Sequence, residues 1–256
     1  MRIVAKFKTL LDAYRHPWYL LLFSTYYSKM LPALRGKVFD VLDPRALNAA
    51  RHCLFNGEII ALPTDTVYGL ACNANNEEAI QRLYEIKGRD CYKPVAICVK
   101  NVEAFRLYGK SDHLNDSLLQ LLLPGPITII IERSPHLSNR FLNPNTTKIG
   151  IRIPRCKFIQ DLCLLFGEQP LALTSANRSA ERSSLNIKEF EFLWPKLGGI
   201  FDAGQIGLTE ERRSASTVID LSQPGLYKIV REGVALKYTM DVLHKFNIKS
   251  MASKIV

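Results

Sequence analysis

Hydroxyl-bearing and cationic side chains gather where apolar segments of the chain end. The segment 58–62 runs directly into Pro-Thr-Asp-Thr and then a tyrosine, so a core strand would end in several hydroxyl groups. Phosphate and carboxylate oxygens are bound by such cations and hydroxyl donors, with backbone amides between them. The pattern therefore predicts a cationic, hydroxyl-lined pocket for an anionic ligand such as a nucleotide. Its candidate residues are Thr64, Tyr68, Lys87, Arg89, Thr128, Arg152, Ser175, Asn177, Ser183, Ser216 and Arg231.

Each of these residues also has a purely structural interpretation when it is considered alone. Thr64 and its neighbours are typical of a turn, and Ser175 is typical of a helix cap. Lys87 and Arg89 complement the C-terminal end of a helix, and Arg152 could be a paired structural arginine. The usual nucleotide cradles, G-x-x-x-x-G-K-[ST] and G-x-G-x-x-G after a strand, are absent from the sequence. If the ligand is ATP, we expect a different scaffold to hold it.

An alternation of short β-rich segments and amphipathic helices must position these groups. Alternation of this kind is typical of an α/β protein whose sites lie at strand ends, and one domain is the economical interpretation. The periodicity predicts helices over 46–55, 75–87, 112–123, 160–166 and 187–193. It predicts strands over 58–62, 94–99, 127–131, 149–153, 171–174, 199–201, 217–221 and 227–230.

The composition limits the class of protein and of partner. The chain has 256 residues, of which 47% are hydrophobic, so it can bury a large core. Its formal net charge of +10 favours polyanionic partners, namely nucleotides, nucleic acid or an acidic membrane surface. The six cysteines include no Cys-x-x-Cys pair, so we expect buried thiols in a reduced compartment rather than a disulfide or metal framework.

The first 41 residues form a strongly basic leader. Seven basic residues and one acidic residue lie between Met1 and Phe39, and the longest apolar run, 18–23, is too short to span a bilayer. One interpretation is a mitochondrial transit segment, and another is an extra N-terminal helix and linker that stays on the protein. Peripheral membrane contact through Trp18, Tyr19 and the leucines is a third. The predicted organisation is a leader over 1–41, a single α/β domain over 42–236 and a tail with a short helix over 237–256, located in the cytoplasm, in mitochondria or in both.

Seven segments in order resemble the YrdC family of threonylcarbamoyl-adenylate synthases, especially its short animal members. They are LPTDTVYGLAC, YEIKGRDCYKPVAICV, LLPGPITIII, IGIRIP, LALTSANRSA, STVIDLS and IVREG, and the likeness runs from about Ala46 to Ala235. The resemblance implies a twisted mixed β-sheet with flanking helices and a basic concave face. It also implies a reaction in which L-threonine, bicarbonate or CO2, and ATP give threonylcarbamoyl-AMP and pyrophosphate. A partner complex would then transfer the threonylcarbamoyl group to transfer RNA beside the anticodon.

The resemblance also implies a role for each candidate residue. Lys87 and Arg89 would bind the phosphates of ATP, with Arg231, Thr128 and Ser183 also contacting the nucleotide. Ser175 and Asn177 would line the centre where the two substrates meet. Thr64, Tyr68, Ser216 and Arg152 would bind threonine, with Arg152 on its carboxylate or on the carbamate. Mg²⁺ would accompany ATP, because a metal ion bridging the phosphates assists transfer and the sequence contains no dedicated metal cage.

The sequence departs from the family pattern at two positions and over one region. Cys98 stands where many members carry a histidine that faces threonine, and Asp90 replaces a frequent proline. The extra C-terminal domain of the longer branch is absent, so we expect the leader or the residues after Arg231 to exclude water from the product. Two other classes of function stay open. One is a non-catalytic module that binds RNA weakly through phosphates, and the other is a hydrolase or transferase acting on a related adenylate.

Overall fold

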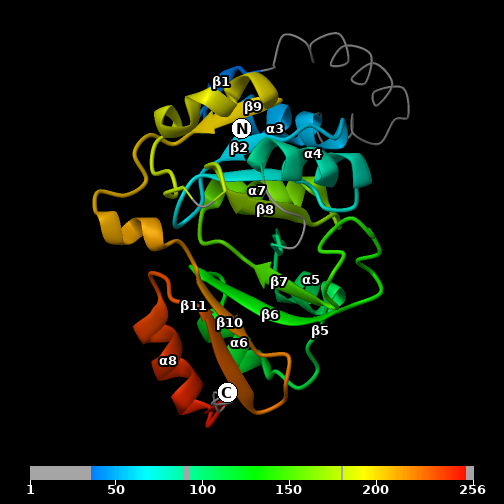
Figure 1. Cartoon of the computed structure of the whole chain (residues 1–256), viewed down its shortest axis with the longest axis vertical. Helices are drawn as coiled ribbons and strands as arrows, with labels where there is room; N and C mark the ends of the chain where they lie inside the picture. The colour runs from blue at the N-terminus through cyan, green and yellow to red at the C-terminus, as the bar shows by residue number, and fades with distance from the viewer. Residues whose placement is uncertain (1–35, 89–92, 180, 252–256) are drawn as a thin grey trace, which may run out of the picture.

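The computed structural model of the chain describes residues 36–88, 93–179 and 181–251. Its strands form one mixed sheet in the order β1-β9-β2-β3-β8-β4-β7-β6-β10-β11-β12, with β5 added beside β6. Parallel pairs such as β4 with β7 alternate with antiparallel pairs such as β3 with β8. Figure 1 shows the sheet running the length of the molecule with helices packed along it. The expected α/β class with a twisted mixed sheet is confirmed.

The predicted strands are all present, with ends that shift by one or two residues. The described strands are β1 Val38–Asp40, β2 Ile60–Leu62, β3 Gly69–Asn73, β4 Ala96–Cys98, β5 Gly109–Lys110, β6 Ile127–Arg133, β7 Lys148–Arg152, β8 Leu171–Ser175, β9 Gly199–Asp202, β10 Thr217–Asp220, β11 Leu226–Arg231 and β12 Lys249–Ser250. The sequence analysis did not anticipate β1, β3, β5 or β12. Of these, β3 matters most, because it joins β2 to β8 directly after the hydroxyl-rich turn.

The helices follow the predicted pattern with three differences. They are α3 Ala46–Phe55, α4 Glu77–Lys87, α5 Val102–Tyr108, α6 Asp116–Leu122, α7 Lys157–Phe166 and α8 Leu236–Lys245. The segment expected as a helix over 187–193 is a 3₁₀ helix, η1 Ile187–Lys196, and a second one, η2 Glu210–Ser214, precedes β10. The sequence analysis missed α5. None of the helices in these ranges is long and apolar enough to cross a membrane.

Local sequence explains where the helix that carries Lys87 begins and ends. The side chain of Asn76 accepts a hydrogen bond from the Ala79 backbone N–H, 2.9 Å away, which satisfies one of the free donors of the first turn of α4. Glu77 and Glu78 follow in that turn, where the helix dipole favours acidic groups. Gly88 then adopts a left-handed conformation with φ of 53°, which ends the helix directly after Lys87.

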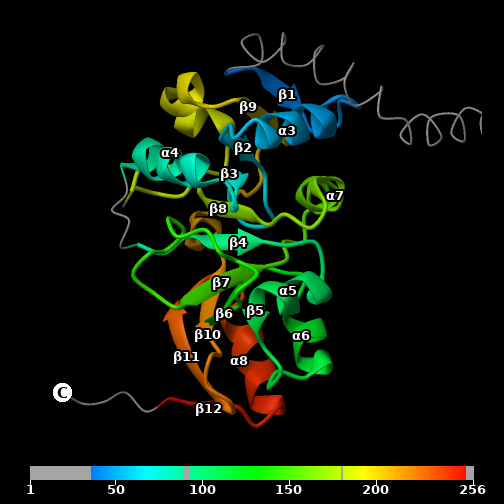
Figure 2. The same ribbon diagram turned by 90° about the vertical axis from the view of Figure 1, so that its right-hand side faces the viewer.

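The two faces of the sheet are covered unequally. On one face, apolar side chains from most strands pack against α4, α5, α6, α8 and η1 in a large core. On the other face, α3 and α7 cover only the half built from β1, β9, β2, β3, β8 and β4. Figure 2 shows α4 and α7 on opposite sides of β3 and β8. Within residues 36–88, 93–179 and 181–251, therefore, no helix packs on the second face over β7, β6, β10 and β11.

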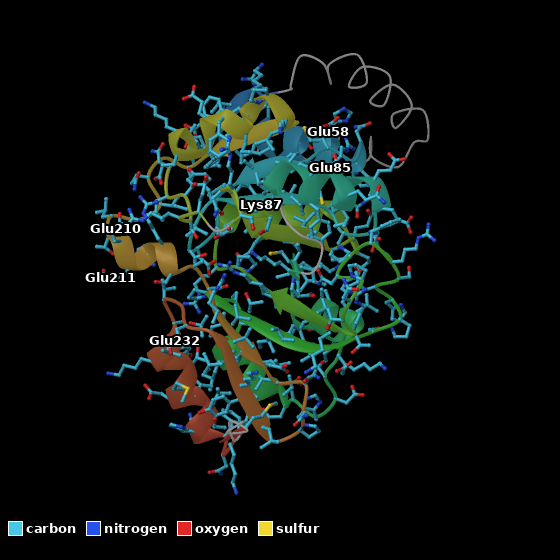
Figure 3. All side chains as sticks on the ribbon, in the orientation of Figure 1. Glu58, Glu85, Lys87, Glu210, Glu211 and Glu232 are labelled. Carbon is cyan, nitrogen blue, oxygen red and sulfur yellow. The ribbon has the colours of Figure 1, made fainter. Side chains whose placement is uncertain are left out.

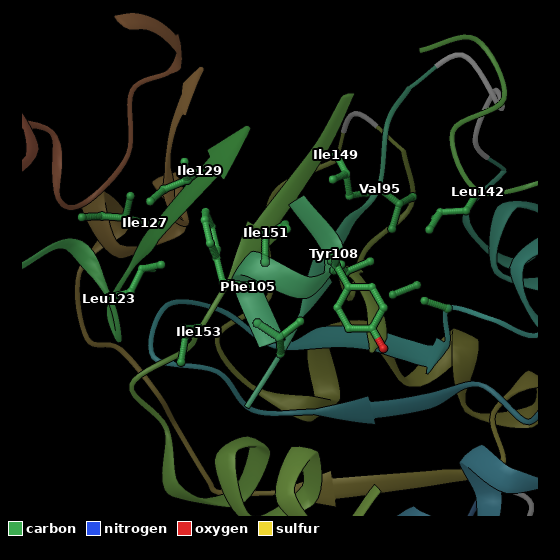
Figure 4. Close-up of a cluster of buried hydrophobic side chains, with 14 of the residues drawn as sticks. Val95, Phe105, Tyr108, Leu123, Ile127, Ile129, Leu142, Ile149, Ile151 and Ile153 are labelled. Atoms are coloured by element: carbon green, nitrogen blue, oxygen red, sulfur yellow. The ribbon is translucent and has the colours of Figure 1, made fainter. Parts of the chain in front are cut away.

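The alternation of side chains in β6 and β7 fixes which residues meet the uncovered face. Ile127, Ile129, Ile149 and Ile151 belong to the large core, as Figure 4 shows. Successive residues of a strand point to opposite faces, so the residues between these isoleucines face the other way. A polar or small side chain at those positions, such as Thr128, is therefore available to a ligand.

Both ends of the described chain pack into the same sheet and core. β1 falls within the range 1–41 expected as leader, and it pairs in parallel with β9. α8 and β12 fall within the range 237–256 expected as a tail, and Val242 and Leu243 of α8 are buried in the core. The sheet therefore begins before residue 42 and continues past residue 236. The division into leader, domain and tail stays a prediction, because residues 1–35 and 252–256 lie outside the described residues.

Candidate active site

One pocket gathers six of the predicted site residues where the helix-covered half of the sheet meets the uncovered half. They come from separate parts of the chain, namely Thr64, Thr128, Arg152, Ser175, Ser216 and Arg231. The remaining wall is mostly small or apolar, with Val67, Gly69, Pro94, Val95, Ala96, Ile130, Gly150, Leu173, Thr174, Ala215 and Val218. The six predicted residues bring two guanidinium groups and four side-chain hydroxyls to a single concave surface, and Thr174 is a fifth hydroxyl-bearing residue of its lining. An anionic ligand is what such a set can bind.

A chain of hydrogen bonds links Thr128, Ser216 and Arg231 across three strands. The hydroxyls of Thr128 and Ser216 lie 2.9 Å apart, and Arg231 donates from Nη2 to the Ser216 hydroxyl, also at 2.9 Å. Arg231 further donates to the Ser216 carbonyl oxygen from Nε at 3.0 Å and from Nη2 at 2.8 Å. In the sheet, Val218 of β10 pairs with Thr128 of β6 on one side and with Arg231 of β11 on the other. Thr128 and Arg231 therefore lie on either side of β10. The guanidinium is therefore fixed in direction at the edge of the pocket.

Arg152 is the second cation of the pocket, and it is 5% exposed. Its Nη2 donates to Asp65 Oδ1 and, at 2.8 Å, to the Thr66 hydroxyl. Its buried Nε finds no hydrogen-bond partner among the described residues. An unsatisfied buried donor costs about 1–3 kcal/mol. As a cation among the lining residues, Arg152 is a second group that could receive an anion.

The hydroxyl-rich turn after β2 holds itself together before it meets any ligand. The Thr64 hydroxyl donates to the Val67 carbonyl at 2.7 Å and accepts from the backbone N–H groups of Thr66 and Val67, at 3.1 and 3.2 Å. Asp65 accepts from the Arg155 backbone N–H at 2.9 Å as well as from Arg152. The turn thus fixes both Thr64 and the carboxylate that orients Arg152. Asp65 and Thr66 thus hold a pocket-lining arginine, a role that the sequence analysis did not give them, although they lie inside the quoted motif.

Lys87 lies behind the pocket wall rather than among its lining residues. It is 2% exposed, and its ammonium group donates to the Ser175 carbonyl oxygen at 2.6 Å and to Asn177 Oδ1 at 3.1 Å. It also donates to the Asn177 carbonyl oxygen. Figure 3 marks Lys87 at the end of α4. The lysine therefore holds the segment that presents Ser175, and these contacts do not place it on the phosphates as predicted.

The structure does not bring three other predicted residues to the pocket lining. The fully buried Tyr68 has its hydroxyl 2.8 Å from the Gly204 carbonyl oxygen and 3.1 Å from Asp202 Oδ1, and burial raises its pKa. Asn177 donates from Nδ2 to the carbonyl oxygens of Arg178 and Glu181, both at 2.7 Å. The carbonyl oxygen of Ser183 accepts from Arg213. These placements favour structural roles, and the ligand contacts expected of the three residues stay predictions, as does that of Arg89, which lies outside the described residues.

Cys98 does not face the pocket either. It is fully buried in the core that α3 and α7 form, and burial raises the pKa of its thiol well above the ordinary value. In the sheet it pairs with Arg152 on one side and Leu171 on the other. The position expected to face threonine is thus covered by a helix, so the thiol can contribute little to ligand binding here.

Gly233 supports the pocket through its lack of a side chain. A Cβ at this position would lie 2.4 Å from the Ser216 carbonyl carbon and 2.4 Å from the Thr217 backbone nitrogen. These atoms belong to the backbone, which cannot rotate out of the way as a flexible side chain can. The backbone at the start of β10 would therefore have to shift. We expect Gly233→Ala to lower the free energy of unfolding by about 1–3 kcal/mol in urea denaturation and to weaken ATP binding in calorimetry. Gly225→Ala, at the other end of β11, is the control. Its φ of +73° means that the change also lowers the free energy of unfolding, but a Cβ there would meet no atom within 4 Å. We therefore expect ATP binding to be unchanged.

Comparisons with known proteins agree with this architecture. A profile of the Sua5/YciO/YrdC family, described as "Telomere recombination", matches residues 52–233. The chain is 48% identical to the bovine threonylcarbamoyl-AMP synthase over 205 residues, which cover 79% of this chain and 73% of the bovine one. It is 48% identical to the human protein of the same name, over 78% of this chain and 71% of that one.

Solved structures have the same fold. A crystal structure of Pyrococcus abyssi Sua5 complexed with L-threonine superposes with a TM-score of 0.68 at 28% identity and covers 80% of this chain. The chain spans 58% of the length of that archaeal protein. The Escherichia coli YciO structure matches with a TM-score of 0.66 at 24% identity, over 77% of this chain and 94% of that one, which supports the fold alone. The profile match covers well over half of the chain, and the chain therefore belongs to the Sua5/YciO/YrdC family.

Proposed function

We propose that the protein is a threonylcarbamoyl-AMP synthase, which joins L-threonine, bicarbonate or CO2, and ATP and releases pyrophosphate. Mammalian relatives that carry this activity in their names are 46–48% identical to it over nearly four fifths of the chain. The observation that carries the proposal is the pocket itself, in which Arg152 and Arg231 converge with four hydroxyl groups. The product would serve the modification of transfer RNA beside the anticodon, through a separate transferase complex.

The chemistry requires two anions to react in the pocket. The amine of threonine attacks the carbon of CO2 and loses a proton to form a carbamate. From bicarbonate, a C–O bond also breaks and water leaves with that proton. A carbamate oxygen then attacks the α-phosphorus of ATP, and the bond to the β-phosphate breaks as pyrophosphate leaves with the electron pair. Holding both anions in line and neutralising the charge that develops is the main contribution that a protein can make to this step. No covalent intermediate with the protein is needed.

The two arginines divide this work between the substrates. Arg152, which lines the pocket, receives the carboxylate of threonine or the carbamate, while Asp65 and Thr66 hold its guanidinium in place. Arg231 lies on the other side of the pocket with the hydroxyls of Thr128 and Ser216, where it meets the phosphates of ATP. Ser175 lies on the opposite wall, fixed through its carbonyl oxygen by Lys87. The pocket thus holds an amino acid and a nucleotide next to each other.

The described residues do not form a cage for Mg²⁺. Within those residues no group of three or more His, Cys, Asp or Glu side chains could hold a metal ion. Asp65, the carboxylate next to the pocket, already accepts hydrogen bonds from Arg152 and from the Arg155 backbone. We therefore propose that Mg²⁺ is bound by the phosphate oxygens of ATP rather than by this chain. Location in the cytoplasm, in mitochondria or in both is likewise a proposal, which rests on the basic leader.

An omission assay tests the proposed function. The protein is incubated with ATP, L-threonine and bicarbonate, and pyrophosphate release is measured with each component left out in turn. We expect release only when all three are present, together with a threonylcarbamoyl-AMP adduct in mass spectrometry. Release without threonine would indicate an ATP hydrolase instead. No release in any mixture would favour a non-catalytic nucleic-acid-binding module.

A further inference from the structure

Asn143 is a buried polar residue that the proposed reaction does not use directly. It lies in the loop between β6 and β7, is 2% exposed, and has a φ of 53°. That left-handed conformation is uncommon for residues other than glycine, but asparagine tolerates it better than most. A buried side-chain amide in such a conformation has to be held by its contacts. The identity of these contacts indicates what the residue does.

The amide of Asn143 binds both backbone groups of Val95. The Val95 N–H donates to Asn143 Oδ1 at 2.7 Å, and Asn143 Nδ2 donates to the Val95 carbonyl oxygen at 2.9 Å. Val95 directly precedes β4, whose paired residues begin at Ala96. The Asn143 side chain therefore gives Val95 the donor and acceptor that a neighbouring strand gives the residues of β4 from Ala96 onward. A primary amide is suited to this because it carries both groups side by side.

The backbone that Asn143 holds is a wall of the pocket. Pro94, Val95 and Ala96 are consecutive lining residues, whereas Asn143 itself is not among the residues that line the pocket. Figure 4 shows Val95 next to Leu142, the residue that precedes Asn143. Any displacement of Asn143 is thus transmitted to a surface that a substrate meets. Its effect would be indirect, through the position of Val95.

Helix α4 connects this wall to the opposite one. The Tyr84 hydroxyl donates to Asn143 Oδ1 at 3.2 Å, and Lys87, one turn further along the helix, donates to the Ser175 carbonyl oxygen. Arg133 holds the loop from the other side, through a hydrogen bond from Nη2 to the Leu142 carbonyl oxygen at 2.6 Å. One helix therefore anchors both the Val95 wall and the Ser175 wall. Their separation is set by side chains that lie outside the pocket.

We propose that Asn143 is a positioning residue that fixes the Pro94–Ala96 wall and thereby sets the affinity of the pocket for its substrates. The proposal rests on the proposed function for the identity of those substrates, ATP and L-threonine. It differs from a role in stability alone, because the amide is matched to the backbone of a lining residue. Loss of the amide frees the wall, and the substrate that packs against it then binds less tightly.

The test uses a matched pair of asparagines from the same loop. Asn143→Gly removes the amide but keeps the left-handed backbone accessible. Asn139→Gly removes a comparable buried amide, 5% exposed, whose Nδ2 donates to the Ala74 carbonyl oxygen at 2.8 Å, away from the pocket. Urea denaturation, the KM for ATP and for L-threonine, and hydrogen exchange over residues 93–99 are measured for both. We expect similar losses of stability in the two variants.

The expected difference lies in the other two measurements. In Asn143→Gly the Val95 amide exchanges at least tenfold faster and the KM of at least one substrate rises tenfold or more, while kcat falls less than threefold. In Asn139→Gly the exchange rate of the Val95 amide, both KM values and kcat stay within twofold of the wild type. Tyr84→Phe, a milder change, is expected to raise the same KM two- to fivefold, and it replaces Asn143→Gly if that variant does not fold.

Some results would overturn the proposal. Both KM values within twofold of the wild type in Asn143→Gly, or in Tyr84→Phe if it is the variant used, would leave Asn143 with a role in stability only. An equal rise in KM in Asn139→Gly would have the same meaning. If the wild type releases no pyrophosphate, the proposed function fails instead. Hydrogen exchange and calorimetric ATP binding then still decide whether Asn143 fixes the wall.

Discussion

Replacing Arg152 by lysine is expected to lower kcat/KM by about 100-fold, chiefly through a higher KM for L-threonine. The guanidinium binds Asp65 and Thr66 through Nη2, and Arg152 is one of the residues that line the pocket. An ammonium group is a single point charge and cannot retain two fixed partners while it presents a separate donor to a substrate. Initial rates of pyrophosphate release at varied threonine concentrations measure the effect.

The control for this change lies three residues along the chain. Arg155 is exposed, and its guanidinium donates to the Pro124 carbonyl oxygen rather than into the pocket. Arg155→Lys is expected to keep KM and kcat within about twofold, because the charge and the backbone contact to Asp65 both remain. Equal kinetics for the two lysine variants would show that Arg152 is a structural residue only.

Replacing Lys87 by methionine is expected to lower the free energy of unfolding by about 3 kcal/mol and to remove most activity at the same time. Three oxygen atoms, the Ser175 carbonyl and two of Asn177, would lose a charged donor in a buried site. The segment that presents Ser175 would then no longer be held. Urea denaturation and pyrophosphate release on the same preparation measure the two effects.

Stability separates this expectation from the prediction that Lys87 binds phosphate. A lysine used only for phosphate would lose activity on substitution while the folded protein kept its stability. Lys188→Met removes an exposed charge from η1, and its unfolding free energy is expected to change by less than about 0.5 kcal/mol. Unchanged stability of Lys87→Met with lost turnover would restore the phosphate assignment.

The alternating pattern of the strands is what made most of the pocket predictable. In β6 and β7, isoleucines alternate with Thr128 and with Arg152, so the sequence itself indicates that these side chains oppose the core. α4 was equally clear, because Asn76, two glutamates and Gly88 mark its ends. Such local signals do not depend on which strands become neighbours.

Side-chain direction within loops depends on pairing that the sequence does not reveal. Tyr68 and Lys87 are near pocket residues in the chain, yet neither lines the pocket, because Tyr68 bonds Gly204 and Lys87 bonds the backbone of Ser175 from behind. β3 itself was missed for the same reason, since only its two neighbours make the short segment of small residues a strand. The role of Asn143 was hidden as well, because its partner Val95 lies 48 residues earlier.

The order of the strands also has a consequence for synthesis on the ribosome. β6 and β7 are neighbours in the chain and can pair as soon as they emerge, but β10, the other neighbour of β6, is made some 90 residues after the start of β6. Until then the edge of β6 that pairs with β10 is open, and the pocket lacks Ser216 and Arg231. A translation stop before β10 therefore leaves an exposed β-edge, which favours aggregation.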